Sequence, residues 1–365
     1  MNNNRKIAIV TAGGDCPGMN AVIRAVTKTA ILDHGLDVIG IEDGFEGLVS
    51  GRWHPLAYED VSGIVTLGGT ILGTSNTVDP YAYARKQGTK IEHTNESGTV
   101  LKNIEKLGIE CLVCVGGDGS LTVANRLSRE GVAVVGIPKT IDNDVAGTDV
   151  SVGFDTAVST ATEAIDRIHT SAQSHHRVMI IEVMGRNAGW LALFAGVAGG
   201  GDIVIIPEMP YDINVVVDRV RERSRRGKRF TIVVISEGAR QVGGQVVIKR
   251  LVAESADPVR LGGVGFVLAD QIEGLTDIET RALVLGHLIR GGSPTAADRV
   301  LATRLGTRAM DLVFSHQCGC MVGVRAGELV KVPLDEVSAR QRTVPVDYPL
   351  INAARSVGTC LGDRR

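Results

Sequence analysis

Residues 6–20 read KIAIVTAGGDCPGMN, a run of Ile, Ala and Val followed by a glycine-rich turn and the start of a helical pattern. A strand that is buried on both faces of a parallel sheet is apolar throughout, because neither face meets water. A glycine-rich turn that joins such a strand to a helix is typical of doubly wound α/β folds. This stretch therefore predicts that the chain begins with a parallel α/β sheet.

The same pattern recurs along the rest of the sequence. Stretches with helical spacing lie between the apolar runs; residues 156–170 place their apolar side chains on one stripe, with Asp155 at the position of an N-cap. The predicted strands are residues 6–11, 38–42, 111–115, 132–137, 178–183, 202–206, 231–236 and 282–285. This many strands alternating with helices predict two doubly wound, Rossmann-like α/β/α lobes.

The composition of the 365 residues is that of a globular protein, with 44% hydrophobic and 22% charged residues. The net charge of −2 gives no electrostatic reason to expect nucleic acid or an anionic membrane as a partner. No apolar run reaches the ~18 residues that a membrane span needs. Cys111 and Cys114 form a C-x-x-C inside a predicted strand with no second pair at zinc spacing, so we expect reduced thiols and a cytoplasmic protein.

In doubly wound sheets, ligands bind beyond the carboxyl ends of the strands, so the residues after each apolar run are the candidates. After the first run, Gly13 and Gly14 begin a turn with G-x-x-x-x-G spacing to Gly18. Met19 and Asn20 stand where a Walker loop needs Lys and Ser or Thr, so this is not a Walker loop. It is either an anion-binding turn at a helix N-terminus or an ordinary tight turn.

A second glycine-rich turn follows the predicted strand 111–115. It reads GGDGS and contains Gly117, Asp118, Gly119 and Ser120. Glycines let a phosphate chain approach the backbone, and a carboxylate there can hold Mg²⁺, which takes oxygen ligands. The alternative is that Asp118 only caps the following helix.

The stretch after the predicted strand 132–137 reads PKTIDND. Its carboxylates, Asp142 and Asp144, lie two residues apart beside Lys139 and Thr140. One carboxylate can accept a proton from a substrate hydroxyl while the other orients it or binds metal. Solvated loop acids are the alternative interpretation.

Charged side chains also follow three later strands. Arg186 follows strand 178–183, Glu237 follows strand 231–236, and His287 and Arg290 follow strand 282–285. Arginine can bind phosphate with two parallel hydrogen bonds. Each of these residues taken alone is more typical of a surface ion pair or of a satisfied core group than of a ligand site; their shared position after strands favours a ligand site.

Together these segments resemble the phosphofructokinase family, whose members phosphorylate fructose 6-phosphate at its 1-hydroxyl. The resemblance extends through GGDCPGMN, GGDGS, PKTIDND, MGRNAGW, SEG and LGHLIRGGSPTAADR, in the family's order, from Gly13 to near Arg299. It implies the family's two-lobed fold and a glycolytic kinase. It further implies a phosphoryl-donor lobe of residues 1–153 plus about 289–330, a sugar-phosphate lobe of about 154–288, and a C-terminal extension of 331–365.

The resemblance also implies site residues. Asp142 corresponds to the base that deprotonates the 1-hydroxyl, with Thr140, Asp144 and Arg186 as further catalytic residues. The implied donor site consists of Gly13, Gly14, Gly117, Asp118, Gly119 and Ser120, with Asp118 as the Mg²⁺ ligand. The implied sugar-phosphate site consists of Thr140, Asp142, Arg177, Met184, Gly185, Arg186, Glu237, Arg281, His287 and Arg290. Arg177 and Arg281 correspond to arginines that reach in from a neighbouring subunit, so a homodimer or homotetramer is expected.

The sequence departs from the family pattern at the donor site. Asn76 stands where ATP-using members often carry an arginine, so Lys139 is the candidate that meets the transition-state charge. Lys139 is itself typical of members that use pyrophosphate, but these carry an aspartate where this chain has Gly119. An aspartate at 119 would fill and charge the space for a nucleotide's α-phosphate. We therefore expect ATP as the donor, with pyrophosphate as the alternative.

Two other functions are compatible with parts of the sequence. A lipid or NAD kinase would explain GGDGS but not PKTIDND or the MGR at 184–186. A sugar-phosphate-binding regulator that has lost catalysis would be expected to lose its acids first. Asp118, Asp142 and Asp144 are all present, which favours an enzyme.

Overall fold

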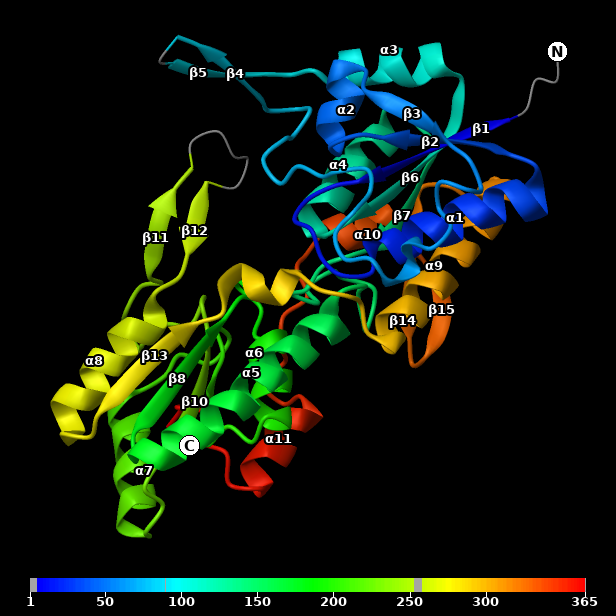
Figure 1. Cartoon of the computed structure of the whole chain (residues 1–365). Coiled ribbons are helices and arrows are strands. Elements are labelled where there is room, and N and C mark those ends of the chain that lie inside the picture. Colours follow the sequence, from blue (N-terminus) through cyan, green and yellow to red (C-terminus); the bar gives the residue numbers. More distant parts are fainter. Residues whose placement is uncertain (1–4, 89, 253–257, 365) are drawn as a thin grey trace. The chain divides into compact units, whose positions relative to one another are not determined.

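The computed structural model describes residues 5–88, 90–252 and 258–364. They divide into two compact units. Unit 1 contains Met1–Thr156 and Arg290–Gln341, and unit 2 contains Ala157–Leu251, Val259–Ile289 and Arg342–Arg365. Each unit is built around its own sheet, as the alternation of strands and helices predicts (Figure 1).

The sheet of unit 1 has seven strands. Its five inner strands are parallel, and antiparallel strands close both edges. In spatial order the strands are β15 (Glu328–Pro333), β14 (Cys320–Arg325), β7 (Val134–Pro138), β6 (Ile109–Gly116), β1 (Lys6–Thr11), β2 (Asp37–Ile41) and β3 (Trp53–Leu56). Because β1 pairs with β2 on one side and with β6 on the other, the strand order reverses between β1 and β6. Such a reversal is where doubly wound sheets bind their ligands.

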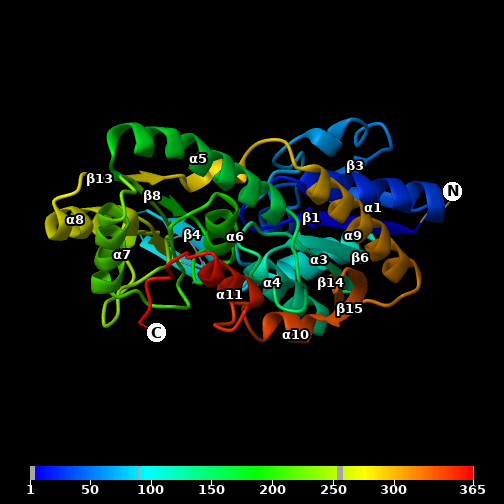
Figure 2. The same ribbon diagram turned by 90° about the horizontal axis from the view of Figure 1, so that it is seen from below.

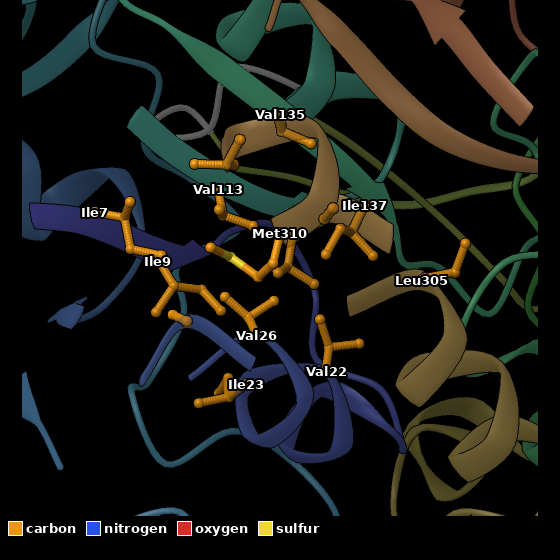
Figure 3. Close-up of a cluster of buried hydrophobic side chains, with 14 of the residues drawn as sticks. Ile7, Ile9, Val22, Ile23, Val26, Val113, Val135, Ile137, Leu305 and Met310 are labelled. Carbon is orange, nitrogen blue, oxygen red and sulfur yellow. The ribbon is translucent and has the colours of Figure 1, made fainter. Parts of the chain in front are cut away.

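Helices cover both faces of this sheet. One face packs against α1 (Met19–His34) and α9 (Ala296–Phe314), which contact each other along their length (Figures 1 and 2). In Figure 3, Ile9 of β1 lies beside Val26 of α1 and Met310 of α9. The other face packs against α2 (Phe45–Ser50), α3 (Ser97–Leu107), α4 (Asp118–Arg129) and α10 (Leu334–Ser338). Smaller elements of this unit are η1 (Ile64–Thr66) and the hairpin of β4 (Tyr83–Gln87) and β5 (Lys90–Thr94).

The sheet of unit 2 has four strands, all parallel. In spatial order they are β13 (Thr280–Val284), β8 (Val178–Val183), β10 (Thr231–Ser236) and β9 (Ile203–Ile205). The face that α7 (Ile213–Arg225) and α8 (Val264–Thr276) cover is apolar and buried. The remaining elements are α5 (Phe154–His175), α6 (Trp190–Ala198), η2 (Gly286–Arg290), α11 (Pro349–Ser356) and the hairpin of β11 (Ile248–Leu251) and β12 (Val259–Leu261).

All eight predicted strands are present, and three of them have the predicted bounds: β1, β8 and β10. The prediction of Asp155 as an N-cap is wrong. Asp155 lies inside α5 and accepts a hydrogen bond from Thr295 Oγ1 at 2.6 Å. The buried carboxylate of Asp298, which belongs to α9, instead accepts from the backbone N–H groups of Gly153 and Thr156, both at 2.9 Å. A residue distant in sequence therefore satisfies the free N–H groups at the start of this helix.

Residues 331–365, expected as an extension, are divided between the units. β15 and α10 complete the sheet and one face of unit 1. Residues after Gln341 belong to unit 2, where Cys360 pairs with Ile203 at the edge of the sheet. Among the described residues, no helix is both long enough and apolar enough to cross a membrane.

Candidate active site

The first two glycine-rich turns meet at the reversal of strand order in unit 1. Ala12 N–H donates to the carbonyl of Val115 at 3.0 Å, which joins the ends of β1 and β6. A Cβ atom on Gly13, which has a φ of +84°, would lie 3.0 Å from Ser120 Oγ, and one on Gly116 would lie 2.4 Å from Ser120 Cβ. Glycine at these two positions lets the turns pack closely against each other.

Asp118 and Gly119 are the first two residues of α4. Asp118 is half-buried, whereas Gly119 is exposed, and a Cβ atom added at Gly119 would meet no atom within 4 Å. The N-terminus of a helix attracts phosphate through its free N–H groups and its dipole. The space beside Gly119 is therefore open at the end of a helix that favours anions.

Lys139 connects the loop of residues 138–144 to the two glycine-rich turns by hydrogen bonds. Its side chain is buried, and its ammonium donates to the carbonyl of Ala12 at 2.9 Å and to that of Gly14 at 2.5 Å. The backbone N–H of Lys139 donates to the carbonyl of Gly116 at 2.9 Å. Burial lowers the pKa of Lys139, because the charged form loses its hydration. The lysine thus positions the glycine-rich turn and places a cation directly beneath it.

Arg290 lies at the same turn. Its guanidinium donates to the carbonyl of Asp15 at 3.0 Å. A Cβ atom on Gly14 would lie only 2.6 Å from Arg290 Nη1, so the glycine makes room for the arginine. The resemblance implies that Arg290 binds the sugar phosphate. Within unit 1, however, Arg290 contacts the glycine-rich turn that begins at Gly13.

The loop with the paired carboxylates is held by its own hydrogen bonds. Asp142 N–H donates to Thr140 Oγ1 at 3.1 Å, and Ser151 Oγ donates to the carbonyl of Thr140 at 2.7 Å. Asp144 accepts from Gln341 Nε2 at 2.6 Å. Asp142 and Asp144 are each only 5% exposed. They are therefore not the solvated loop acids of the alternative interpretation, and their positions are fixed.

A second group of predicted residues gathers in unit 2. Met184, Gly185 and Arg186 follow β8, Glu237 follows β10, and His287 lies in η2 after β13. Because β8 pairs with both β10 and β13, these residues share one end of the sheet. Arg186 N–H donates to Glu237 Oε1 at 3.3 Å. His287 and Arg186 are exposed and Glu237 is half-buried, so these side chains can reach a ligand.

A close backbone contact joins two loops of this group. A Cβ atom on Gly238 would lie 1.7 Å from the carbonyl oxygen of Arg186. Arg186 itself has a φ of +48°, which is unusual for a residue with a side chain. The MGR loop is therefore held in a strained conformation that depends on Gly238, a residue that the sequence analysis did not single out. Its only signal was its position after Glu237.

Arg177 and Arg281 lie at the opposite end of the same sheet, where β8 and β13 begin. Both guanidiniums bind Glu279, at 3.2 Å from Arg177 and 2.8 Å from Arg281, and Arg281 also contacts Glu273 at 3.3 Å. The structure thus brings the two arginines together but separates them from Met184, Glu237 and His287 of the same chain. Glu279 was not predicted, because nothing in sequence distinguishes it from a surface acid.

Glycine-rich turns that meet at the reversal of a doubly wound sheet, above a buried lysine, are typical of phosphate-binding α/β proteins, and unit 1 is of this class. Comparison with known proteins narrows the class. Residues 6–313 match the family model of phosphofructokinase, and the chain belongs to the phosphofructokinase family.

The names of its relatives include two different phosphoryl donors, ATP and pyrophosphate. The chain is 48% identical to ATP-dependent 6-phosphofructokinase 2 of Clostridium perfringens, over 98% of this chain and 99% of the relative. It is 46% identical to pyrophosphate–fructose 6-phosphate 1-phosphotransferase of Amycolatopsis mediterranei, over 94% and 97% of the two chains. The solved phosphofructokinase of Saccharomyces cerevisiae matches with a TM-score of 0.76 and 32% identity, over 92% of this chain and 45% of the yeast chain.

Proposed function

We propose that the chain transfers the γ-phosphoryl group of ATP to the 1-hydroxyl of fructose 6-phosphate, which yields fructose 1,6-bisphosphate in glycolysis. The observation that carries the proposal is the loop of residues 138–144. There a buried lysine reaches the phosphate-binding turn while two buried carboxylates are fixed three and five residues further on. The names of several relatives, among them that of Clostridium perfringens, support this reaction.

Asp142 is the proposed base. The N–H group of Asp142 is bound by Thr140 Oγ1, so the carboxylate is held on a fixed backbone. It accepts the proton of the 1-hydroxyl as the oxygen attacks the γ-phosphorus, and Thr140 and Asp144 position the transferring group. Lys139 and Arg186 are the proposed cations that meet the charge that develops on the phosphoryl oxygens.

The donor would lie on the turn at Gly13 and Gly14 and on the stretch Gly117, Asp118, Gly119 and Ser120. The open space at Gly119 favours ATP, because an α-phosphate and nucleoside can extend where a larger side chain would exclude them. Two of the three N–H bonds of the Lys139 ammonium are already used by the carbonyls of Ala12 and Gly14. Lys139 therefore discriminates little between ATP and pyrophosphate.

The Mg²⁺ that the family resemblance implies fits the residues present. Asp118 offers a carboxylate directly after two glycines, at the start of α4. Mg²⁺ in phosphoryl-transfer sites takes one or two protein carboxylates together with phosphate oxygens and water. In the described part of the chain, no group of three His, Cys, Asp or Glu side chains could hold a metal by itself. When bound, Mg²⁺ would neutralise charge on the phosphates.

The sugar phosphate would be bound by Met184, Gly185, Arg186, Glu237 and His287, together with Arg290. Glu237 accepts hydrogen bonds from sugar hydroxyls, and the cations bind the 6-phosphate. We further propose that Arg177 and Arg281 act on the site of a neighbouring subunit in a homodimer or homotetramer. Their place at the other end of β8 and β13 supports this, since the strands separate them from the residues above. The proposed location is the cytoplasm.

The test is a coupled assay of the purified chain with fructose 6-phosphate and Mg²⁺, in which ATP and pyrophosphate are compared as donors. We expect turnover with ATP and its loss when EDTA removes Mg²⁺. Turnover with pyrophosphate alone would assign the chain to the alternative donor. Binding of fructose 6-phosphate without turnover with either donor would support the non-catalytic sugar-phosphate regulator.

A further inference from the structure

Two cysteines that are distant in sequence face each other in unit 1. Cys111 Sγ and Cys318 Sγ lie 3.7 Å apart, although 207 residues separate them in the chain. Cys111 is near the start of β6, and Cys318 lies in the connection between α9 and β14. Neither residue takes part in the proposed reaction. Both cysteines are free.

The backbone fixes this pair at the start of β7. Leu112 N–H donates to the carbonyl of Ala133 at 2.9 Å, and Gly319 N–H donates to that of Val134 at 2.8 Å. The residues directly after Cys111 and Cys318 are therefore anchored to adjacent carbonyls on opposite sides of one strand. A disulfide needs the sulfur atoms at ~2.05 Å, and Cys318 is in a loop beside Gly319, where the backbone can adjust. Strands that flank one strand lie about 9.6 Å apart, so the backbone at Cys318 must also move toward β6 before the bond can form.

The two thiols differ in reactivity. Cys111 is buried at 3% exposure, whereas Cys318 is half-buried. The hydrogen bond from the Cys111 thiol lowers the pKa of Cys318, because it stabilises the thiolate. Burial raises the pKa of Cys320 to about 11 and that of Cys114 to about 12. Cys318 is therefore the nucleophile of the group, and Cys111 is placed to resolve its oxidation product.

We propose that Cys318 and Cys111 are a site of reversible oxidation by hydrogen peroxide, with a disulfide as the product. The Cys318 thiolate attacks one peroxide oxygen, the O–O bond breaks, and the hydroxide that leaves takes up a proton to become water. Cys318 is then a sulfenic acid. Cys111 sulfur attacks Cys318 sulfur, the S–O bond breaks, and a second water leaves. The two thiols lose two electrons, which reduce one peroxide to two waters, and a thiol reductant reverses the step.

The site is separate from the proposed donor site. Cys111 lies at the amino end of β6, and the turn with Asp118 follows its carboxyl end at Gly116. Five residues separate Cys111 from Gly116 along this strand, which corresponds to roughly 17 Å at ~3.3 Å per residue. Formation of the disulfide therefore joins β6 to the α9–β14 connection without displacing the glycine-rich turns.

The experiment treats the full chain with hydrogen peroxide, blocks the remaining thiols by alkylation, and analyses a tryptic digest without reduction. The peptides of interest are residues 107–126 and 309–325, which contain Cys111 with Cys114 and Cys318 with Cys320. We expect the two peptides to be linked, the count of alkylated thiols to fall from six to four, and dithiothreitol to restore all six. Fragmentation of the linked pair should place the bond between Cys111 and Cys318.

Variants make the test specific. Cys318→Ser and, independently, Cys111→Ser should each abolish the link, whereas the matched controls Cys114→Ser and Cys320→Ser should retain it. A link that persists in both Cys318→Ser and Cys111→Ser would overturn the proposal. So would a wild-type chain in which all six thiols remain alkylatable, or in which Cys318 passes directly to sulfinic acid without any linked peptide.

Discussion

Arg281 offers the sharpest test of how the sites are assembled. It lies at the start of β13, six residues before His287, and Arg177 lies seven residues before Met184 across β8. At ~3.3 Å per residue these distances come to roughly 20 Å, which exceeds the reach of an arginine side chain. If Arg281 binds the sugar phosphate, it must do so on another subunit.

The perturbation is a pair of inactive variants, Asp142→Asn and Arg281→Ala, expressed together. Loss of one partner in a charged phosphate contact costs about 2–5 kcal/mol, so Arg281→Ala alone should lose at least roughly 30-fold in kcat/KM. A hybrid dimer contains one subunit of each variant. If Arg281 acts on the neighbouring site, one active site contains both substitutions and the other contains neither. Random pairing makes about half of the dimers hybrid, so about a quarter of wild-type activity should return if the pairing is isologous.

The assay measures fructose 6-phosphate phosphorylation by the co-purified mixture, after differently tagged subunits have confirmed that hybrids form. The matched control replaces Arg281→Ala with Asp118→Ala. Asp118 and Asp142 belong to the same unit of one chain, so each hybrid site carries a lesion and no activity should return. Confirmed hybrids of Asp142→Asn and Arg281→Ala that recover no activity would refute the shared site.

Three further substitutions test single parts of the account. A Cβ atom at Gly119 meets no atom within 4 Å, and Gly119→Asp adds an anion beside the donor, so we expect an unchanged Tm and a loss of at least about tenfold in kcat/KM for ATP. Unchanged ATP use would remove Gly119 as a donor determinant. Lys139→Met tests the buried ammonium, because burial lowers the pKa of Lys139 from 10.5. Between that lowered pKa and 10.5 the folded chain binds fewer protons than the unfolded chain. The free energy of unfolding of the wild type should therefore rise with pH, relative to that of the variant, by at most ~1.4 kcal/mol per pH unit. Parallel curves from chemical denaturation would contradict this. Gly238→Ala places a Cβ atom 1.7 Å from the carbonyl oxygen of Arg186, so it should lower Tm and raise the KM for fructose 6-phosphate. The control Gly274→Ala lies in open space within α8 and should stabilise the folded chain by ~0.5–1 kcal/mol.

The parts of the fold that sequence predicted well are the strands with two buried faces. Every residue of β8 and of β10 is buried, so their apolar runs have the same bounds as the strands. Most of the strands that were missed lie at sheet edges or in hairpins, but the missed β14 is an inner strand whose first five residues are buried. Only one of the six residues of β15 is buried, and β3 contains a proline, because an edge strand has one neighbour and tolerates polar residues and proline.

The candidate site was predictable only where its residues follow strands. Gly13, Asp118 and Asp142 could be found this way, since the carboxyl ends of parallel strands lie together. The contacts that hold them could not. Gln341 binds Asp144 from 197 residues away, and Asp298 binds Gly153 from 145 residues away. Such pairs depend on where the segment after α10 and the start of α9 pack, which no local sequence pattern indicates.

In the proposed reaction, Asp142 removes the proton from the 1-hydroxyl during phosphoryl transfer from ATP. The most direct measurement is steady-state kinetics of Asp142→Asn beside the wild type, with fructose 6-phosphate, ATP and Mg²⁺. The amide that this substitution introduces cannot accept the proton, but it keeps the size of the side chain and leaves the backbone N–H bond to Thr140 in place. We expect kcat to fall by at least ~10² while the KM for fructose 6-phosphate changes little. A variant that retains near-normal kcat would contradict the account.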